Sequence, residues 1–168
     1  NIIKFDEAYF INIQDKTFHE IAFDVSRTFI GTDIIPDEDL KIIIETAFNF
    51  DLPLVKVQKD LSVLELFHGP TSAFKDFGAR FMANVLGFLQ KKNDIKTTIV
   101  TATSGDTGGA VASAFHNVKD VNVFILYPKG RVSDFQEKQI AGLGDNIRAI
   151  EINGSFDDCQ AMVKACFE

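Results

Sequence analysis

A lysine at the start of an expected helix is the first residue whose setting could support covalent chemistry. Lys75 follows the loop FHGPTSAF and opens a run with apolar residues at helical spacing. The positive end of the helix dipole and the flanking Phe74 and Phe77 both disfavour an ammonium group there. A neutral amine is the form that attacks a carbonyl carbon, so Lys75 is a candidate for imine chemistry on a carbonyl cofactor. The alternative interpretation is a solvated lysine in an ion pair with Asp76.

A second loop is rich in small residues and lies between an expected strand and an expected helix. It reads TATSGDTGGA from Thr101 to Ala110. Small residues let backbone N–H groups approach a ligand, and a helix N-terminus adds partial positive charge, which together suit a carboxylate or a phosphate. The loop matches neither the Walker pattern nor GxGxxG, because no Gly-Lys-Ser or Gly-Lys-Thr follows and its glycines are spaced differently. An ordinary capped turn is the alternative interpretation.

The elements that must position these loops alternate between strands and helices after Pro53. Short β-branched or aliphatic runs predict strands, and amphipathic runs predict helices. The expected strands are 54–57, 62–66, 97–102, 121–127 and 147–152, and the expected helices are 74–91, 107–116, 133–141 and a last one capped by Ser155 and Asp158. This alternation predicts an α/β fold with a parallel sheet flanked by helices. Chemistry then gathers beyond the carboxyl ends of strands, at residues 67–76 and 102–109.

Residues 1–52 are expected to form a mainly helical segment, and residues 53–168 an α/β domain. Two apolar stripes at helical spacing support the helical part: Phe18, Ile21, Ala22, Val25 and Phe29, then Leu40, Ile43, Ile44 and Ala47. Thr17 and Glu20 have the spacing of a capping box, and Pro36 marks a second helix start. In the expected helix 74–91, the phenylalanines at helical spacing are predicted to lie in the core: Phe74, Phe77, Phe81 and Phe88.

Composition excludes several classes of function. The 168 residues carry a net charge of −7, with 24 acidic and 17 basic side chains, so no basic field is present to bind nucleic acid. The apolar runs fall short of the roughly 20 residues that cross a bilayer, and no secretory signal opens the sequence, which predicts a soluble cytoplasmic protein. The first residue is Asn, which suggests a trimmed N-terminus.

The cysteines and histidines do not have the spacing of a metal site. Cys159 and Cys166 are seven positions apart in a helical pattern, which separates them by about 10 Å along the axis. We therefore expect two reduced core residues and no disulfide. No CxxC or His-x-x-x-His spacing occurs, so no metal site is expected.

Two segments together carry a family resemblance. Residues 65–76 (ELFHGPTSAFKD) are similar to the segment that holds the Schiff-base lysine in threonine synthases, and residues 102–108 (ATSGDTG) are similar to the glycine-rich loop of that family. The likeness extends into residues 126–130 (LYPKG) and 156–160 (FDDCQ). The chain thus resembles the N-terminal part of threonine synthases, which are pyridoxal-phosphate lyases of fold type II, the tryptophan synthase β-like fold.

The resemblance implies a reaction and a set of site residues. Lys75 would form the Schiff base with pyridoxal 5'-phosphate and later move protons, and Phe74 and Asp106 would contact the cofactor. The substrate-binding residues would be Thr103, Ser104, Gly105 and Thr107. The reaction would convert O-phosphohomoserine and water to threonine and phosphate, an amino-acid biosynthesis step with a small-molecule substrate. The oligomeric state is left open.

Departures from the family pattern limit these expectations. Asp106 stands where many relatives outside the family have Asn, and Ser72 stands where a larger apolar residue is expected. The family's second glycine-rich loop, which grips the cofactor phosphate, is not found, since Gly142-Leu143-Gly144-Asp145-Asn146 is typical of a helix stop and turn. The partner of the pyridine nitrogen is not found either. We therefore expect the C-terminal remainder to be absent and this piece alone to be inactive.

Three other functions remain open from the sequence. Another pyridoxal-phosphate lyase or dehydratase of the same fold would share the lysine chemistry. A serine hydrolase would use Ser104 or Thr107 with His68 and Asp106, although no GxSxG elbow is present. A non-catalytic anion- or nucleotide-binding module would use the helix N-termini without covalent chemistry, and it would not depend on Lys75.

Overall fold

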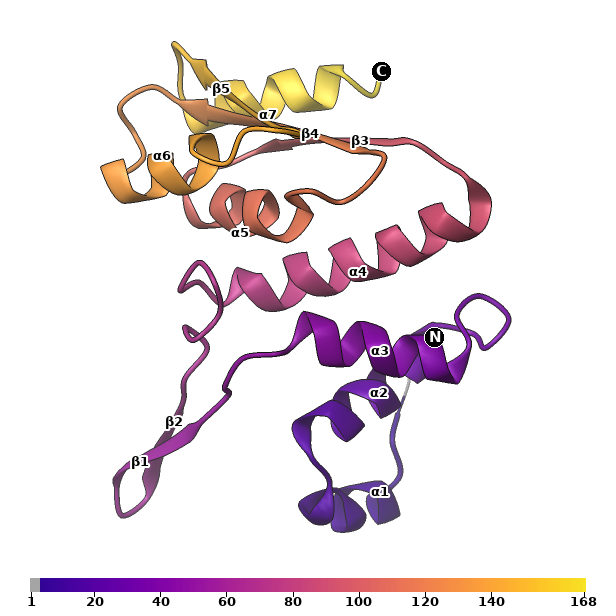
Figure 1. Ribbon diagram of the computed structural model, residues 1–168. Helices are drawn as coiled ribbons and strands as arrows, with labels where there is room; N and C mark the ends of the chain where they lie inside the picture. The colour runs from indigo at the N-terminus through magenta and orange to yellow at the C-terminus, as the bar shows by residue number, and fades with distance from the viewer. Residues whose placement is uncertain (1–3) are drawn as a thin grey trace. The chain divides into compact units, whose positions relative to one another are not determined.

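The computed structural model describes residues 4–168, which form two compact units divided between Asn49 and Phe50. The first unit is helical (Figure 1). It contains α1 (Glu7–Asn12), the short 3-10 helix η1 (Ile13–Asp15), α2 (Phe18–Phe29) and α3 (Asp37–Ala47). The two apolar stripes correctly predict α2 and α3, whereas α1 and η1 are too short to have been predicted from periodicity.

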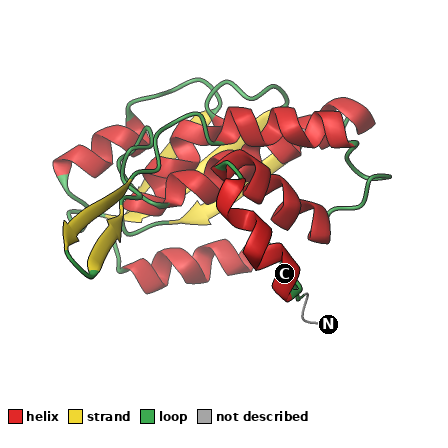
Figure 2. Cartoon of the chain, turned by 90° about the horizontal axis from the view of Figure 1, so that it is seen from below, coloured by secondary structure: helices red, strands yellow, loops and turns green. Residues whose placement is uncertain are grey.

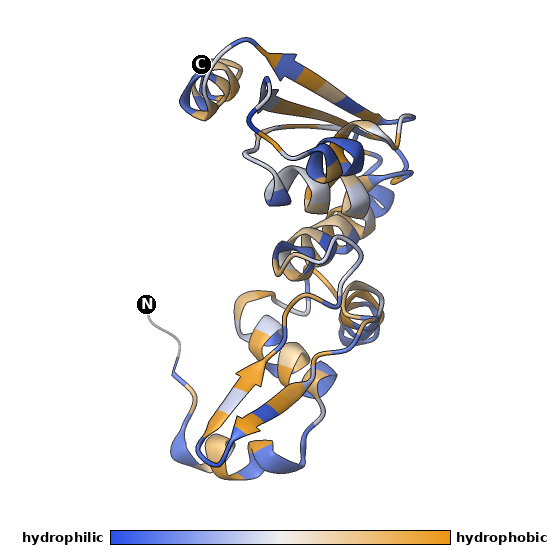
Figure 3. Cartoon of the chain, turned by 90° about the vertical axis from the view of Figure 1, so that its left-hand side faces the viewer, coloured by the Kyte–Doolittle hydropathy of each residue, from blue (hydrophilic) through white to orange (hydrophobic). Residues whose placement is uncertain are grey.

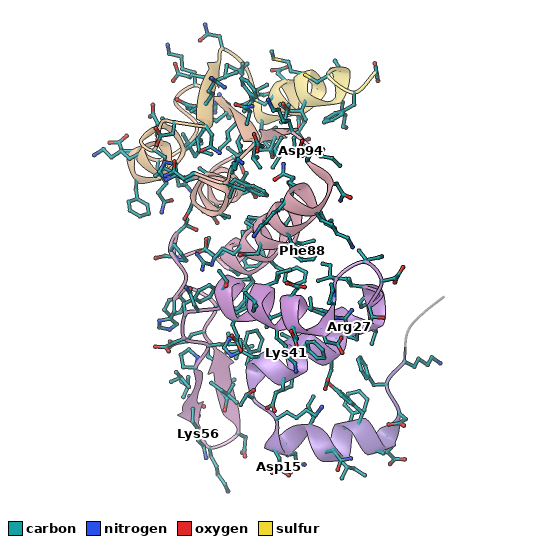
Figure 4. All side chains as sticks on the ribbon, turned by 45° about the vertical axis from the view of Figure 1, so that its right-hand side comes forward. Asp15, Arg27, Lys41, Lys56, Phe88 and Asp94 are labelled. Carbon is teal, nitrogen blue, oxygen red and sulfur yellow. The ribbon has the colours of Figure 1, made fainter. Side chains whose placement is uncertain are left out.

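Local contacts define the ends of the helices in the first unit. Thr17 and Glu20 form the predicted capping box at the start of α2, with both reciprocal hydrogen bonds present. Arg27, labelled in Figure 4, donates hydrogen bonds from Nη1 to the carbonyl oxygens of Ile30 and Ile35 and contacts Asp37 through Nη2 at 2.8 Å. The connection between α2 and α3 is thereby tied to α2 itself. The predicted apolar face of α3 is buried.

The second unit is an α/β domain built on a parallel sheet. Its elements are β1 (Leu54–Gln58), β2 (Leu61–Leu64), α4 (Lys75–Asn93), β3 (Thr97–Ala102), α5 (Asp106–Phe115), β4 (Val121–Pro128), α6 (Asp134–Ala141), β5 (Ile147–Ile152) and α7 (Phe156–Ala165). These bounds lie close to the predicted ranges. Strands β3, β4 and β5 pair in parallel in that order. Helices α5 and α6 cover one face of the sheet and α7 covers the other (Figures 1 and 3).

The first two strands are not part of that sheet. β1 and β2 pair antiparallel as a separate hairpin, with Leu54 opposite Leu64, and Figure 2 shows them apart from the other strands. The two residues between them, Lys59 and Asp60, can join antiparallel strands but are far too few for a parallel crossover. All residues of both strands are exposed, although most are apolar and appear orange in Figure 3. The Lys75 loop therefore follows a hairpin strand and not a strand of the parallel sheet.

The core of the second unit lies between the parallel sheet and the helices α5 and α6. Strand β4 is central, and Val121, Val123 and Ile125 on it are buried together with Phe115 of α5 and Ile140 of α6. A strand covered on both faces is expected to be mostly apolar, and β4 is apolar except for the exposed Asn122 near its start. Within residues 4–168, no helix is long and apolar enough to cross a membrane.

The buried face of α4 is not the one predicted. Phe74, just before the helix, is 59% exposed, and Phe77, Phe81 and Phe88 are half-buried. The buried positions of α4 are instead Asp76, Ala79, Ala83 and Gln90. For Ala79 and Ala83 the advantage is size, because α4 packs on the small residues of α5 and a short side chain permits close approach of the two helices. The prediction that all four phenylalanines lie in the core was therefore wrong.

The two cysteines have different environments. Both are free thiols, and only Cys159 is buried. Cys166 is the C-cap of α7 and keeps helical backbone angles, but it lies at the exposed end of the helix. Its thiol contacts the carbonyl oxygen of Met162 at 3.3 Å. The expectation of two core cysteines was thus correct for Cys159 and wrong for Cys166.

Candidate active site

Lys75 is the first residue of α4 and its side chain is half-buried. Its Nζ atom lies 4.4 Å from the centroid of the Phe74 ring. The ion pair with Asp76 is not formed, because both carboxylate oxygens of Asp76 accept hydrogen bonds from Thr71 instead. Among the described residues Lys75 has no ion-pair partner, so its amine is available at the positive end of a helix.

A buried carboxylate fixes the loop that precedes Lys75. Asp76 is fully buried, and it accepts hydrogen bonds from Thr71 N at 2.8 Å and from Thr71 Oγ1 at 2.7 Å. Gly69 makes room for this carboxylate, because a Cβ atom at position 69 would lie 2.5 Å from Asp76 Oδ2. Ser72 completes the tight turn with a φ of 59°. Sequence reasoning considered Asp76 as a partner of Lys75 and missed its role in shaping the loop.

The second loop is held by the hydroxyl of Thr103. This side chain is 1% exposed, and its Oγ1 accepts hydrogen bonds from Gly105 N at 2.9 Å and Gly108 N at 2.8 Å. The hydroxyl also donates to the carbonyl oxygen of Gly105 at 3.1 Å. Thr103 therefore caps α5 from outside the helix, because Gly105, at the N-cap position, has no side chain to do so. Gly105 itself has a φ of 146°, which favours glycine.

The starts of α4 and α5 meet around one cavity. It has a volume of about 470 Å³. The residues that line it come from α4 with its N-cap and from α5. They are Phe74, Lys75, Phe77, Gly78, Ala79 and Met82, then Thr107, Ala110 and Val111. An apolar cavity of this size with a few convergent polar groups, here the Lys75 amine and the Thr107 hydroxyl, is typical of small-molecule sites. The two loops singled out from the sequence thus reach the same place.

The other predicted residues of the second loop, from Thr103 to Asp106, do not line this cavity. Ser104 and Asp106 are exposed, Gly105 is buried, and Thr103 is buried with its hydroxyl committed to the loop. Asp106 Oδ1 accepts a hydrogen bond from Gln136 Nε2 at 2.8 Å. The loop therefore presents hydroxyl and carboxylate groups to solvent next to the start of α5.

The contacts do not support the serine hydrolase hypothesis. That hypothesis needs His68 as a base beside Ser104 or Thr107, with Asp106 orienting the imidazole ring. Instead, His68 Nε2 lies 2.6 Å from Glu65 Oε2, and Asp106 is bonded to Gln136. Among the described residues no group of three or more His, Cys, Asp and Glu side chains is placed to hold a metal ion.

Two glutamines of α6 are connected to the loops and were missed by the sequence analysis. Gln136 bonds Asp106, and Gln139 Nε2 donates to the carbonyl oxygen of Thr71 at 3.3 Å. The spacing of Ser133 and Gln136 is that of a capping box, which the structure contains. That signal could have predicted the start of α6, but no local pattern indicates which distant loops its side chains reach.

Comparison with known proteins places this geometry in a family. Residues 52–168 match the family model described as pyridoxal-phosphate dependent enzyme. The chain belongs to the pyridoxal-phosphate dependent enzyme family. It is 58% identical over 134 residues to threonine synthase from Buchnera aphidicola of Acyrthosiphon pisum, an alignment that covers 79% of this chain and 31% of the relative. The chain thus spans about a third of the length of that relative.

Solved structures agree with this membership. The crystal structure of threonine synthase from Escherichia coli matches with a TM-score of 0.90 and 45% identity, covering 99% of this chain and 38% of that one. The crystal structure of PLP-bound threonine synthase from Brucella melitensis matches with a TM-score of 0.85 and 38% identity, covering 98% and 36%. The α/β fold with a parallel sheet is therefore the fold of this pyridoxal-phosphate enzyme family, as the sequence predicted.

The residues around the cavity fit the family's cofactor. Lys75 supplies an amine that can attach an aldehyde, and the exposed Phe74 ring supplies an apolar surface beside it. The Thr107 hydroxyl and the first N–H groups of α5, at Asp106 and Thr107, supply donors for oxygen atoms, whereas those of Gly108 and Gly109 already bond the loop. This donor set is suited to an aromatic aldehyde with anionic and hydroxyl substituents, and pyridoxal phosphate has that chemistry.

Proposed function

We propose that this protein is a threonine synthase, a lyase that converts O-phosphohomoserine and water to threonine and phosphate in the cytoplasm. The observation that carries the proposal is that the Lys75 amine and the Thr107 loop line one cavity, in a chain 58% identical over 134 residues to a threonine synthase. Because the chain spans about a third of that relative's length, the activity is proposed for the protein expressed from its complete gene.

Lys75 has the central role in this proposal. Its Nζ atom would be the covalent attachment point of the cofactor and would then carry protons between substrate carbon atoms. When bound, pyridoxal phosphate supplies an electron sink that stabilises negative charge on those carbons. The half-buried position of the amine, over the Phe74 ring, limits its access to water and keeps it at the cavity.

The second loop would bind substrate and orient the cofactor. Ser104 and Thr107 would hold the substrate carboxylate with hydroxyl and N–H groups near the positive end of α5. Gly105, whose own N–H already bonds Thr103 Oγ1, would contribute by giving the loop its shape. Asp106 would lie beside the cofactor's ring oxygen, and Phe74 would contact its ring. Thr103 would act through the loop, because its hydroxyl already bonds two backbone N–H groups.

Borohydride trapping tests the proposal at Lys75. The protein expressed from its complete gene is incubated with pyridoxal phosphate, reduced, digested, and the peptides are identified by mass. We expect the reduced cofactor on Lys75 and its loss in Lys75→Ala. The matched control is Lys91→Ala, which removes an exposed lysine in the last turn of the same helix and should leave the adduct intact.

A second assay separates the remaining alternatives. Phosphate and threonine are measured after O-phosphohomoserine is added to the loaded protein. Adduct formation without threonine would favour another lyase or dehydratase of this fold. No adduct on a folded protein would favour a non-covalent anion-binding module, whose ligand protection against unfolding would survive Lys75→Ala.

A further inference from the structure

Helix α6 reaches both loops of the candidate site through two side chains one helical turn apart. Gln136 and Gln139 are separated by three positions, so they lie on the same face of α6. Gln136 bonds Asp106, the first residue of α5, and lies against Gly105 before it, whereas Gln139 contacts the loop that precedes α4. Neither glutamine lines the cavity at Lys75. Any influence on the site would therefore act through the loops.

The amide of Gln136 uses both of its ends. Its Oε1 accepts hydrogen bonds from Ser133 N and Ser133 Oγ, each at 3.1 Å, which completes the cap of α6. Its Nε2 donates to Asp106 Oδ1 at 2.8 Å. A hydrogen bond to a carboxylate is about twice as strong as one between neutral groups. The carboxylate of Asp106 is thereby oriented by a group whose own position is fixed by the helix cap.

Gln139 contacts the other loop at the residue that shapes it. Its Nε2 donates to the carbonyl oxygen of Thr71, and the N–H and hydroxyl of Thr71 both bond Asp76, the neighbour of Lys75. Thr71 is therefore held from two directions, by α4 through Asp76 and by α6 through Gln139.

Two glycines provide the space that these side chains occupy. A Cβ atom at Gly105 would lie 2.3 Å from Gln136 Nε2, and one at Gly109 would lie 3.0 Å from Gln139 Oε1. The first distance is far below van der Waals contact, and the second is tight. The small residues of the second loop thus serve packing against α6 as well as ligand access. This steric relationship is independent of the hydrogen bonds and points to the same pair of side chains.

We propose that Gln136 and Gln139 are positioning residues that hold the two loops at a fixed separation, so that Lys75 faces the Ser104–Thr107 loop. The proposal deepens the proposed function and rests on it for the identity of the ligand. The separation of the loops is a property of the chain itself. It can therefore be measured without a cofactor.

The first test uses a variant that separates the two roles of Gln136. Gln136→Glu keeps the acceptor for Ser133, because glutamate and glutamine both complete a capping box, but it removes the donor to Asp106 and opposes two carboxylates. The matched control, Ser133→Ala, removes only the hydroxyl of the cap. The bond from the backbone N–H at position 133 to Gln136 Oε1 remains, so the donor to Asp106 stays in place. We expect Gln136→Glu to slow borohydride-trapped adduct formation at Lys75 about tenfold and to change the absorption spectrum of the bound cofactor. Ser133→Ala should change neither by more than about twofold.

A double variant provides the rescue. In Gln136→Glu with Asp106→Asn, the amide donor and the carboxylate acceptor exchange places, so a hydrogen bond can form again. The rate of adduct formation in the double variant should be close to that of Asp106→Asn alone. The substitution Gln136→Glu would then slow the reaction only when Asp106 is present. For the other loop, Gln139→Met keeps the length of the side chain and removes its donor to Thr71. It should also slow adduct formation.

Hydrogen exchange of the cofactor-free protein gives a readout that does not depend on the proposed function. In Gln136→Glu the backbone N–H groups of Gly108 and Gly109 should exchange about tenfold faster, and in Gln139→Met the same should hold for Thr71 N–H. Unchanged exchange in both variants, or equal effects of Ser133→Ala and Gln136→Glu, would overturn the positioning role. If the wild-type protein formed no adduct but the variants still showed faster exchange, the proposed function would be rejected and the positioning role would be retained.

Discussion

Asp76 accepts both hydrogen bonds that Thr71 can donate, one from its backbone N–H and one from its hydroxyl, at 2.8 and 2.7 Å. The two residues enclose the turn that leads into Lys75. Because Asp76 is fully buried and immediately follows Lys75, this pair determines where α4 begins and hence where the lysine amine lies. The acidic side chain next to the candidate catalytic lysine is therefore a structural partner of the loop.

Replacing Asp76 with Ala should destabilise the second unit by about 2 kcal/mol or more, because it leaves two buried donors of Thr71 without an acceptor. Urea denaturation of the purified protein measures the loss. The matched control is Asp157→Ala, which removes an exposed aspartate from the first turn of α7 and should cost less than about 1 kcal/mol. Equal losses in the two variants would contradict the structural role of Asp76.

Thr103 should be sensitive to loss of its hydroxyl and less sensitive to loss of its methyl group. Thr103→Val removes the acceptor for Gly105 N and Gly108 N, and the expected loss of stability is about 2 kcal/mol. Thr103→Ser keeps the hydroxyl and should lose about 1 kcal/mol for the missing methyl. Thermal unfolding of the two variants provides the comparison. A more stable Val variant than Ser variant would rule out a cap of α5 by the Thr103 hydroxyl.

The two cysteines should differ in reactivity. Burial, and after it the charge of Asp158, raises the pKa of the Cys159 thiol above its ordinary value of 9.0, which lowers the fraction of reactive thiolate. Cys166 is exposed. In native protein, iodoacetamide should therefore modify Cys166 at least about 100-fold faster than Cys159, as followed by peptide mass. In denaturant the two cysteines should be modified at similar rates. If they were modified at the same rate in the native protein, Cys159 would not be buried.

Acid should weaken the start of α7. Hydrogen bonds from the backbone N–H of Ser155, and then from its hydroxyl, lower the pKa of Asp158 below its ordinary value of 3.8. A lowered pKa in the folded state means that the charged form is stabilised, so this contribution is complete well above pH 3.8 and is lost as the pH falls through the lower folded value.

Urea denaturation between about pH 5 and pH 2 measures this dependence. In Ser155→Ala the free energy of unfolding should fall less below about pH 4 than it does in the wild type. One of the two bonds to Asp158 needs the Ser155 hydroxyl, and both depend on the conformation of Ser155. Asp157→Asn is the control, since that neighbouring carboxylate forms no capping-box bond. The same acid profile in wild type and Ser155→Ala would contradict the assignment.

Local patterns in the sequence determined most of the secondary structure. Periodicity and capping signals act over a few residues, so Thr17 with Glu20 and Ser155 with Asp158 correctly marked the starts of α2 and α7. The alternation after Pro53 also predicted that the strands now seen as β3, β4 and β5 are parallel, but not their order. It placed β1 and β2 in the same pattern, however, because a strand's composition does not reveal its partner. The connection between those two strands is too short for a parallel crossover, so they form an antiparallel hairpin.

The sequence by itself determined that Lys75 begins a helix after a tight loop and that a small-residue loop begins another helix, because both signals are local. Only the tertiary structure decided that these two starts line one cavity, that Asp76 bonds Thr71, and that Gln136 and Gln139 reach both loops. The physical reason is distance along the chain. Contacts such as Asp106 with Gln136 join residues 30 positions apart, and their geometry depends on how α4, α5 and α6 pack.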